Sequence, residues 1–281
     1  MISRLRRALL LAVALIAAAA NNAGAHSLNA SSGDVEAVIS WEGGAEFGWS
    51  DLWLTVTRGD TTVYDEPIEF RGCEEPSCAP AAALPFYRDR ATLRVRDLDR
   101  DQEPEIAVHV LTSTGHCCTV AYVLRWDGRR YERIVHNFAI PDYRIADLGN
   151  DGRYEFVSAD GRFAYAFDSF AGSWFPPQIW RYDRGRFRDV TRAHPSLIRD
   201  HARAAMRAFK RYSSTRPGTV DYGGGALAAW VADQRLLGNR QHARRFLAEQ
   251  RRSGRIDNLS GYRSAPQFLR SLERKLKRWG Y

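Results

Sequence analysis

Short runs that alternate hydrophobic and polar residues fill the chain from about residue 34 to residue 190. Glycine, aspartate and asparagine break these runs; Leu52 to Thr57, for example, is followed by Arg58-Gly59-Asp60 and then by Thr62 to Tyr64. Alternation over a few residues between such turns is typical of β-hairpins. The pattern therefore predicts an all-β region over residues 26–192.

The pattern changes after Thr191. Apolar residues then recur at helical spacing, first from Ile198 to Tyr212 and last from Phe268 to Trp279. We expect a basic four-helix region over residues 193–281, in which Ser213 to Gly225 is the most linker-like stretch. The predicted fold class is α+β, with an N-terminal all-β region followed by a C-terminal α-helical region.

The β region contains an internal repeat with an offset of 50 residues. Its two copies are the acidic stretches Asp97-Leu-Asp-Arg-Asp-Gln-Glu-Pro-Glu105 and Asp147-Leu-Gly-Asn-Asp-Gly-Arg-Tyr-Glu155, each between two apolar runs. Farther along, Leu124 to Tyr131 matches Ile179 to Phe187, two aromatic runs joined by a turn built on aspartate and glycine. Four strands in a period of about 50 residues are typical of a propeller blade.

Residues 26–192 have room for about three such four-stranded blades. A closed propeller usually needs at least about four. We therefore expect an incomplete set of blades, a set completed by the N-terminal segment and the helices, or a set closed by oligomerisation.

The first 25 residues have the pattern of a secretory signal peptide. Arg4, Arg6 and Arg7 precede an unbroken apolar run of 13 residues, Ala8 to Ala20, and the small residues of Ala23-Gly-Ala25 suit cleavage. Because a helix needs roughly 20 apolar residues to span a bilayer, we expect no transmembrane span after cleavage. The expected location is secreted or extracytoplasmic, in the periplasm or cell envelope; an uncleaved membrane anchor is the alternative.

Charge divides the rest of the chain into two parts. Residues 26–191 hold 18 basic and 27 acidic residues, whereas residues 192–281 hold 20 basic and 6 acidic residues. The basic part would either dock on the acidic part or bind an anionic partner. For an exported protein that partner would be an envelope glycan, an anionic polymer or a protein, and no nucleic acid is expected.

Four cysteines, Cys73, Cys78, Cys117 and Cys118, are expected to form disulfides in an oxidising compartment. Cys73 and Cys78 can close a short loop, which leaves Cys117 and Cys118 to each other in a strained bridge. The other pattern ties Cys73 or Cys78 across to Cys117 and Cys118, and the sequence favours neither. Because His116 is next to Cys117 and Cys118, these three residues could instead form a redox switch or a metal site.

The first acidic stretch places carboxylates at alternate positions, Asp97, Asp99, Asp101, Glu103 and Glu105. Calcium takes about six to eight oxygen ligands, and a tight loop aims alternate residues at one ion. Without a cation the carboxylates repel one another, since two unit charges about 4 Å apart cost roughly 1 kcal/mol even in water. The stretch therefore predicts a calcium site, with a solvated acidic turn balanced by arginines as the alternative.

The second acidic stretch keeps Asp147, Asp151 and Glu155, but Gly149 and Arg153 stand where the first stretch has acids. We expect it to keep the geometry of the turn and to bind metal weakly or not at all.

The first stretch resembles the calcium loop of FG-GAP or VCBS-type repeats, which integrin α-subunit propellers share. Gln102 stands where that pattern has glycine, and Glu105 where aspartate is commoner. The segment Thr114-Gly-His-Cys-Cys-Thr119 is similar to one in uncharacterised exported bacterial proteins with such repeats. The resemblance covers about residues 93–190 and implies blade-like β structure and calcium, but no particular activity.

The sequence contains no nucleophile elbow, phosphate-binding loop, zinc-protease motif or dinucleotide-binding motif. We therefore expect a calcium-supported, non-catalytic binding or scaffold protein of the cell envelope or medium. The alternative is an envelope hydrolase whose site is assembled from scattered residues such as Asp97, Asp99, Asp147 and His116. Carboxylates gathered around one cleft would favour the hydrolase, and carboxylates confined to separate turns would favour binding.

Overall fold

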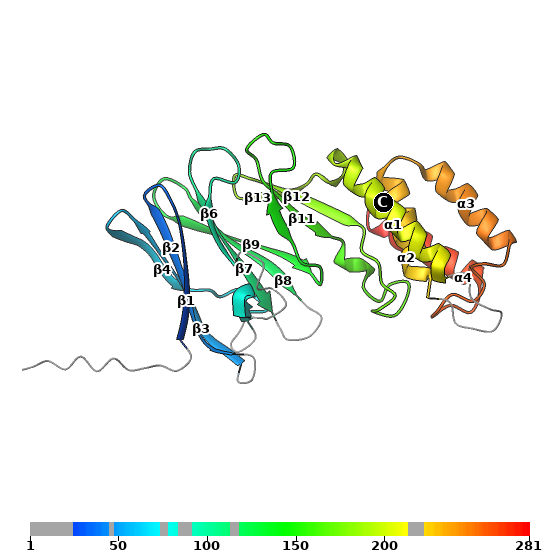
Figure 1. Ribbon diagram of the computed structural model, residues 1–281, viewed down its shortest axis with the longest axis horizontal. Coiled ribbons are helices and arrows are strands. Elements are labelled where there is room, and N and C mark those ends of the chain that lie inside the picture. The colour runs from blue at the N-terminus through cyan, green and yellow to red at the C-terminus, as the bar shows by residue number, and fades with distance from the viewer. Residues whose placement is uncertain (1–24, 45–47, 74–77, 84–91, 113–117, 213–221) are drawn as a thin grey trace, which may run out of the picture.

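The computed structural model describes residues 25–44, 48–73, 78–83, 92–112, 118–212 and 222–281. Within them, three antiparallel sheets are followed along the chain by four α-helices (Figure 1). The predicted α+β class, with strands first and helices second, is confirmed. The predicted signal peptide lies outside the described residues, apart from Ala25.

The first sheet is a four-stranded meander in the order β1-β2-β3-β4. Its strands are β1 (Ala25–Ser32), β2 (Val35–Gly44), β3 (Gly48–Arg58) and β4 (Thr61–Pro67). Val35, Ala37 and Ile39 on β2 are fully buried, whereas Glu36 between them is exposed. The alternation predicted from the sequence thus buries one face of this sheet and leaves the other at the surface.

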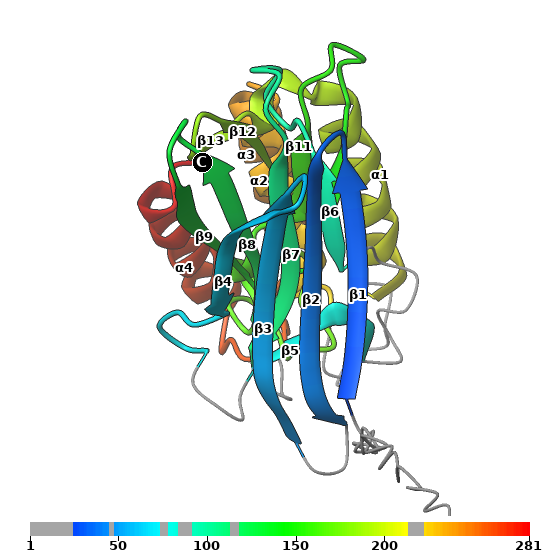
Figure 2. The ribbon, with the colours of Figure 1, turned by 90° about the vertical axis from the view of Figure 1, so that its left-hand side faces the viewer.

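The central strands of the middle sheet, β7 (Glu105–Thr112) and β8 (Thr119–Trp126), are buried on both faces. The sheet's other strands are β5 (Cys78–Pro80), β6 (Leu93–Arg96) and β9 (Tyr131–Ala139). Ile106 and Val108 on β7 share a core with the first sheet, and Ala107 and Val123 share a core with the third. Figure 2 shows the first sheet lying in front of the middle one. Every residue of β7 is therefore buried.

Two short strands together form one edge of this sheet. β6 pairs with the first half of β7 and β5 with its second half. The middle sheet therefore has five strands where the repeat predicted four.

The third sheet is again a four-stranded meander, with strands β10 (Arg144–Ala146), β11 (Glu155–Ala159), β12 (Pro177–Asp183) and β13 (Arg186–Asp189). Phe156 and Tyr182 are fully buried in the core between this sheet and the middle one. The three sheets are thus stacked face to face. Over the described ranges they close into neither a barrel nor a propeller.

The four predicted helices are confirmed as α1 (Pro195–Tyr212), α2 (Gly224–Leu236), α3 (Arg240–Arg252) and α4 (Ala265–Arg278). Phe163 and Phe167, from the segment that follows β11, are buried in the core of these helices. The Tyr281 hydroxyl also donates to Oδ2 of Asp160 (2.8 Å). The helical part is therefore packed against the end of the third sheet. No helix among the described residues is long and apolar enough to cross a membrane.

The last glycines of the linker-like stretch belong to a helix and not to a linker. Gly224 and Gly225 begin α2 and are buried. A Cβ on Gly224 would lie 2.6 Å from the carbonyl oxygen of Phe167, so only glycine allows the Phe167 backbone to approach this closely.

Candidate metal centre

The turn from β6 to β7 folds its carboxylates inward by binding its own backbone. The N–H groups of Arg100 and Gln102 donate to the two oxygens of Asp97 (2.7 and 2.9 Å). The N–H of Leu98 donates to Oε2 of Glu105 (2.9 Å), at the start of β7. These bonds are local, which explains why a nine-residue pattern in the sequence was enough to predict the turn.

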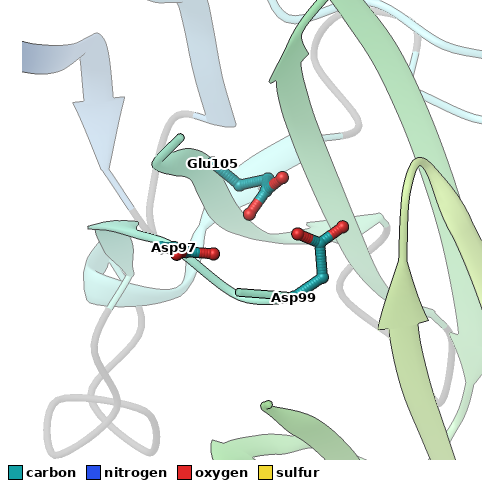
Figure 3. A group of neighbouring side chains, drawn as sticks. All are labelled: Asp97, Asp99 and Glu105. Atoms are coloured by element: carbon teal, nitrogen blue, oxygen red, sulfur yellow. The ribbon is translucent and has the colours of Figure 1, made fainter. Parts of the chain in front are cut away.

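Asp97, Asp99 and Glu105 converge in this turn (Figure 3). One carboxylate oxygen from each lies within 4.8 Å of the others. Asp99 is 5% and Glu105 1% exposed. Oε1 of Glu105 is buried and has no hydrogen-bond partner among the described residues.

This environment disfavours negative charge in the absence of a cation. Burial is the main cause that raises the pKa of Glu105 to about 8, and the neighbouring carboxylates of Asp99 and Asp101 add to it. Burial likewise raises the pKa of Asp99. An all-oxygen donor set that gathers carboxylates in a buried turn fits a hard cation such as calcium better than it fits a soft transition metal.

The other two predicted ligands of the first turn face arginines. Asp101 lies 3.4 Å from the guanidinium of Arg125, and Glu103 forms a salt bridge with Arg58. The structure therefore brings together three of the five acids that the spacing selected. That any of the five binds metal stays a prediction.

The second turn repeats the hydrogen bonds of the first. Gly152 N–H donates to Oδ2 of Asp147 (2.9 Å), and Leu148 N–H donates to Oε2 of Glu155 (3.0 Å). Glu155 is fully buried, but its Oε1 accepts from Nε of Arg181 (2.8 Å). An arginine thus supplies Glu155 with the positive charge that Glu105 lacks in the first turn. Across the described ranges, only the first turn groups three possible metal ligands.

The first turn also contacts both neighbouring sheets. The backbone N–H of Arg184, in the hairpin between β12 and β13, donates to Oδ2 of Asp99 (2.6 Å). Arg58, at the end of β3, reaches Glu103 from the first sheet. These partners were missed from the sequence because they come from other sheets, and no local pattern marks them.

One predicted disulfide is present, between Cys73 and Cys78. Of the two open pairing patterns, this is the one in which these cysteines close their own loop. Cys118 is disulfide-bonded as well. Cys117 and His116 lie outside the described residues, so the redox and metal alternatives stay untested.

Among the described residues, the carboxylates named for a hydrolase do not form one group. Asp97 and Asp99 lie in the first turn, Asp147 lies in the second, and His116 is not described. The described carboxylates thus lie in two hairpin turns, which touch where the Arg100 side chain donates to the carbonyl oxygen of Asp151 (2.8 Å).

Two proteins resemble this chain in sequence. A probable thylakoid lumen protein of Synechocystis sp. is 33% identical over 211 residues, which is 73% of this chain and 58% of that protein. An uncharacterised protein of Sinorhizobium fredii is 30% identical over 157 residues, or 54% of this chain and 24% of that protein.

The chain thus spans little more than half of one relative and a quarter of the other. No family model and no solved structure matches it. The similarity to a probable lumenal protein indicates an extracytoplasmic location.

Proposed function

We propose that this protein is an exported binding or scaffold protein whose β region is stabilised by calcium in the first acidic turn. The observation that carries the proposal is the buried, unpartnered oxygen of Glu105 beside Asp97 and Asp99. A buried charge is costly unless a counter-charge compensates it. A calcium ion would provide that compensation here, as Arg181 does for Glu155 in the second turn.

Asp97, Asp99 and Glu105 would hold the ion. Asp99 also anchors the hairpin of the third sheet through Arg184, and Glu103 in the same turn pairs with Arg58 of the first sheet. Fixing the turn would therefore fix contacts among all three sheets. The ion's role would be structural, and the confinement of the carboxylates to separate turns favours binding over hydrolysis.

The three sheets would be blades of the FG-GAP or VCBS type. The shared turn hydrogen bonds at an offset of 50 residues and the face-to-face stacking support this assignment. The basic first residues and the apolar run after them would be a cleaved signal peptide, and the mature protein would act in the periplasm, the cell envelope or the medium.

A groove of about 890 Å³ along the outer edges of the sheets would bind the partner. It is lined by β4, β9 and the β12–β13 hairpin, and Tyr64, Tyr131, Arg133, Arg184 and Arg186 are among its residues. The arginines of the groove stand beside three carboxylates, Asp65, Glu66 and Glu132, and such mixed hydrogen-bonding groups suit a hydroxylated polymer such as an envelope glycan. Because Asp99 holds the backbone of Arg184, the calcium turn would also position one wall of the groove.

The decisive experiment compares thermal unfolding in millimolar calcium and in chelator. Calcium at about a hundred times its Kd should add about 2.7 kcal/mol to the free energy of unfolding. Glu105→Gln retains the acceptor for Leu98 N–H and removes the charge, so it should abolish the gain. Asp151→Asn, in the second turn, is the matched control and should keep most of it. An unchanged melting temperature in wild-type protein would refute the calcium proposal.

Binding to the groove is tested separately. Wild-type protein should be retained on an array of envelope polysaccharides, and the exposed pair of changes Arg130→Glu and Arg186→Glu should reduce retention. Loss of retention in chelator would further link the groove to the turn. Retention that these two changes leave unaltered would place the binding surface elsewhere.

A further inference from the structure

A second hollow lies on the helical part, far along the chain from the acidic turns. It has a volume of about 630 Å³ and opens between α1, α2 and the turn that joins α2 to α3. Its lining residues are Arg199, Ala202, Arg203, Met206, Arg207, Trp230, Gln234, Leu237 and Asn239. None of them belongs to the calcium turn or to the outer-edge groove, so a role for this hollow does not depend on either of those sites.

The wall that α1 contributes is basic. Arg199, Arg203 and Arg207 are exposed and follow one another at intervals of four residues, so they form a row with a step of about 6 Å along the helix. Arg203 pairs with Asp200, whereas Arg199 and Arg207 make no salt bridge to any described residue. No carboxylate of a described residue lines the hollow. Its charge is therefore positive and largely uncompensated.

The floor of the hollow is apolar. Trp230 is 5% exposed, and Ala202, Met206 and Leu237 line the hollow beside it. At one end, Asn239 donates from its side chain to Oε1 of Gln234 (3.2 Å), which closes that end with two amides. An occupant must therefore bring apolar side chains to the floor and negative charge to the wall.

We propose that this hollow docks an acidic amphipathic helix of a partner protein. A helix with carboxylates at every fourth position repeats the step of the arginine row, so it pairs with Arg199 and Arg207 in one register. It places a third carboxylate at Arg203, in competition with Asp200. The adjacent row of apolar residues on the same helix then faces Met206, Trp230 and Leu237. A glycan offers no large apolar side chains for the floor, and a flat membrane surface does not fill a concave hollow.

The test uses the full-length protein and fluorescent synthetic helices, with binding followed by anisotropy. The probe has glutamate at every fourth position and leucine in the neighbouring row; one control peptide carries glutamine for glutamate, and another has the same composition in scrambled order. The probe should bind more than tenfold more tightly than either control. Its affinity should also fall as salt is raised, because exposed ion pairs are screened.

Variants locate the site. Arg199→Glu with Arg207→Glu should weaken binding of the probe at least tenfold, and Met206→Gln should weaken it several-fold. The matched control, Arg244→Glu with Arg251→Glu on the exposed face of α3, should leave affinity within twofold. If the first pair unfolds the helices, the milder pair Arg199→Gln with Arg207→Gln replaces it.

Several outcomes would overturn the proposal. One is no binding of the probe, and another is an equal loss of affinity in both double variants. A third is that unstructured polyglutamate or anionic phospholipid vesicles bind as tightly as the probe with the same dependence on Arg199 and Arg207, because the hollow would then recognise charge without the helix.

Discussion

The two acidic turns have the same backbone and differ in how one buried glutamate is neutralised. In both, a leading aspartate accepts from the turn's own amides and the closing glutamate accepts from a leucine N–H. Glu155 is paired with Arg181, its partner across the β11–β12 ladder. Glu105 is just as deeply buried, but one of its oxygens has no hydrogen-bond partner in the part of the chain that the structure describes.

The difference lies on the neighbouring strand. Arg125 follows Leu124, the ladder partner of Ile106, and so occupies the position next to Glu105 that Arg181 occupies next to Glu155. Arg125 instead reaches Asp101, whose counterpart in the second turn is Asp151. The arginine across from the buried glutamate is thus bonded to that glutamate in the second turn and to a different acid in the first. In the second turn the protein itself neutralises the buried glutamate, whereas in the first turn we expect a cation to do so.

The largest effect should come from removing the arginine of the complete turn. Arg181→Met leaves Glu155 buried without a counter-charge, which should cost about 3 kcal/mol of unfolding free energy. Arg125→Met removes only a longer, partly exposed pair and should cost about 1 kcal/mol or less. Urea unfolding in chelator at neutral pH measures both. Equal losses would mean that the two arginines play the same role.

Changing the glutamates themselves should give effects of different sign. Glu155→Gln removes a charge-assisted hydrogen bond and should lose about 2 kcal/mol. Without a cation Glu105 is largely protonated at neutral pH, because burial raises its pKa to about 8. In chelator Glu105→Gln therefore replaces one neutral group by another and should be neutral or slightly stabilising. The same urea titrations apply. A clear loss from Glu105→Gln in chelator would show that Glu105 is already compensated within the protein.

The sequence predicted these turns because their bonds are local. Asp97 binds amides three and five residues away, so its spacing from its neighbours is visible in the chain. The bond from Arg184 to Asp99 spans 85 residues and uses a backbone N–H, which any residue except proline provides. The stacking of the sheets decides which acids converge and which face arginines. The alternation of residues along a strand carries no information about this stacking.

The same limit explains two differences in the fold. β5 is only the three residues Cys78–Pro80, too short for alternation to mark it as a strand. Gly224 and Gly225 have the composition of a linker, but they begin a helix because the segment around Phe167 packs against them. In both cases tertiary contact overrides the local pattern.

A third buried carboxylate extends the comparison to the helices and to pH. Asp233 is fully buried, with one oxygen 2.7 Å from Nδ1 of His201 and the other unpartnered among the described residues. Burial raises its pKa from 3.8 to about 6, partly offset by His201. The folded state therefore holds this proton more tightly than the unfolded state does. The stability that results is complete below about pH 4 and is lost as the pH rises to about 6.

Asp233→Asn should remove this dependence. Between pH 4 and pH 7, wild-type protein should lose about 1 to 2 kcal/mol relative to the variant, as measured by urea unfolding at each pH. The difference between the two proteins cancels the titration of groups that do not interact with Asp233, so it reports Asp233 together with its partner His201. A constant difference across that range would show that Asp233 has the same proton affinity in both states.

The smallest effect separates the two turns at a single backbone position. Gln102 and Gly152 occupy equivalent positions with φ of 75° and 77°. Glycine adopts this left-handed conformation freely, whereas a residue with a Cβ is strained by about 1 kcal/mol.

Gln102→Gly should therefore raise the free energy of unfolding by about 0.5 kcal/mol after the added entropy of the unfolded chain is subtracted. Gly152→Ala should lose about 1 kcal/mol or more, because its Cβ would also lie 3.0 Å from Cδ of Arg100. Denaturant titrations in chelator measure both, and a loss of stability from Gln102→Gly would mean that the glutamine side chain stabilises the first turn by more than the backbone strain costs.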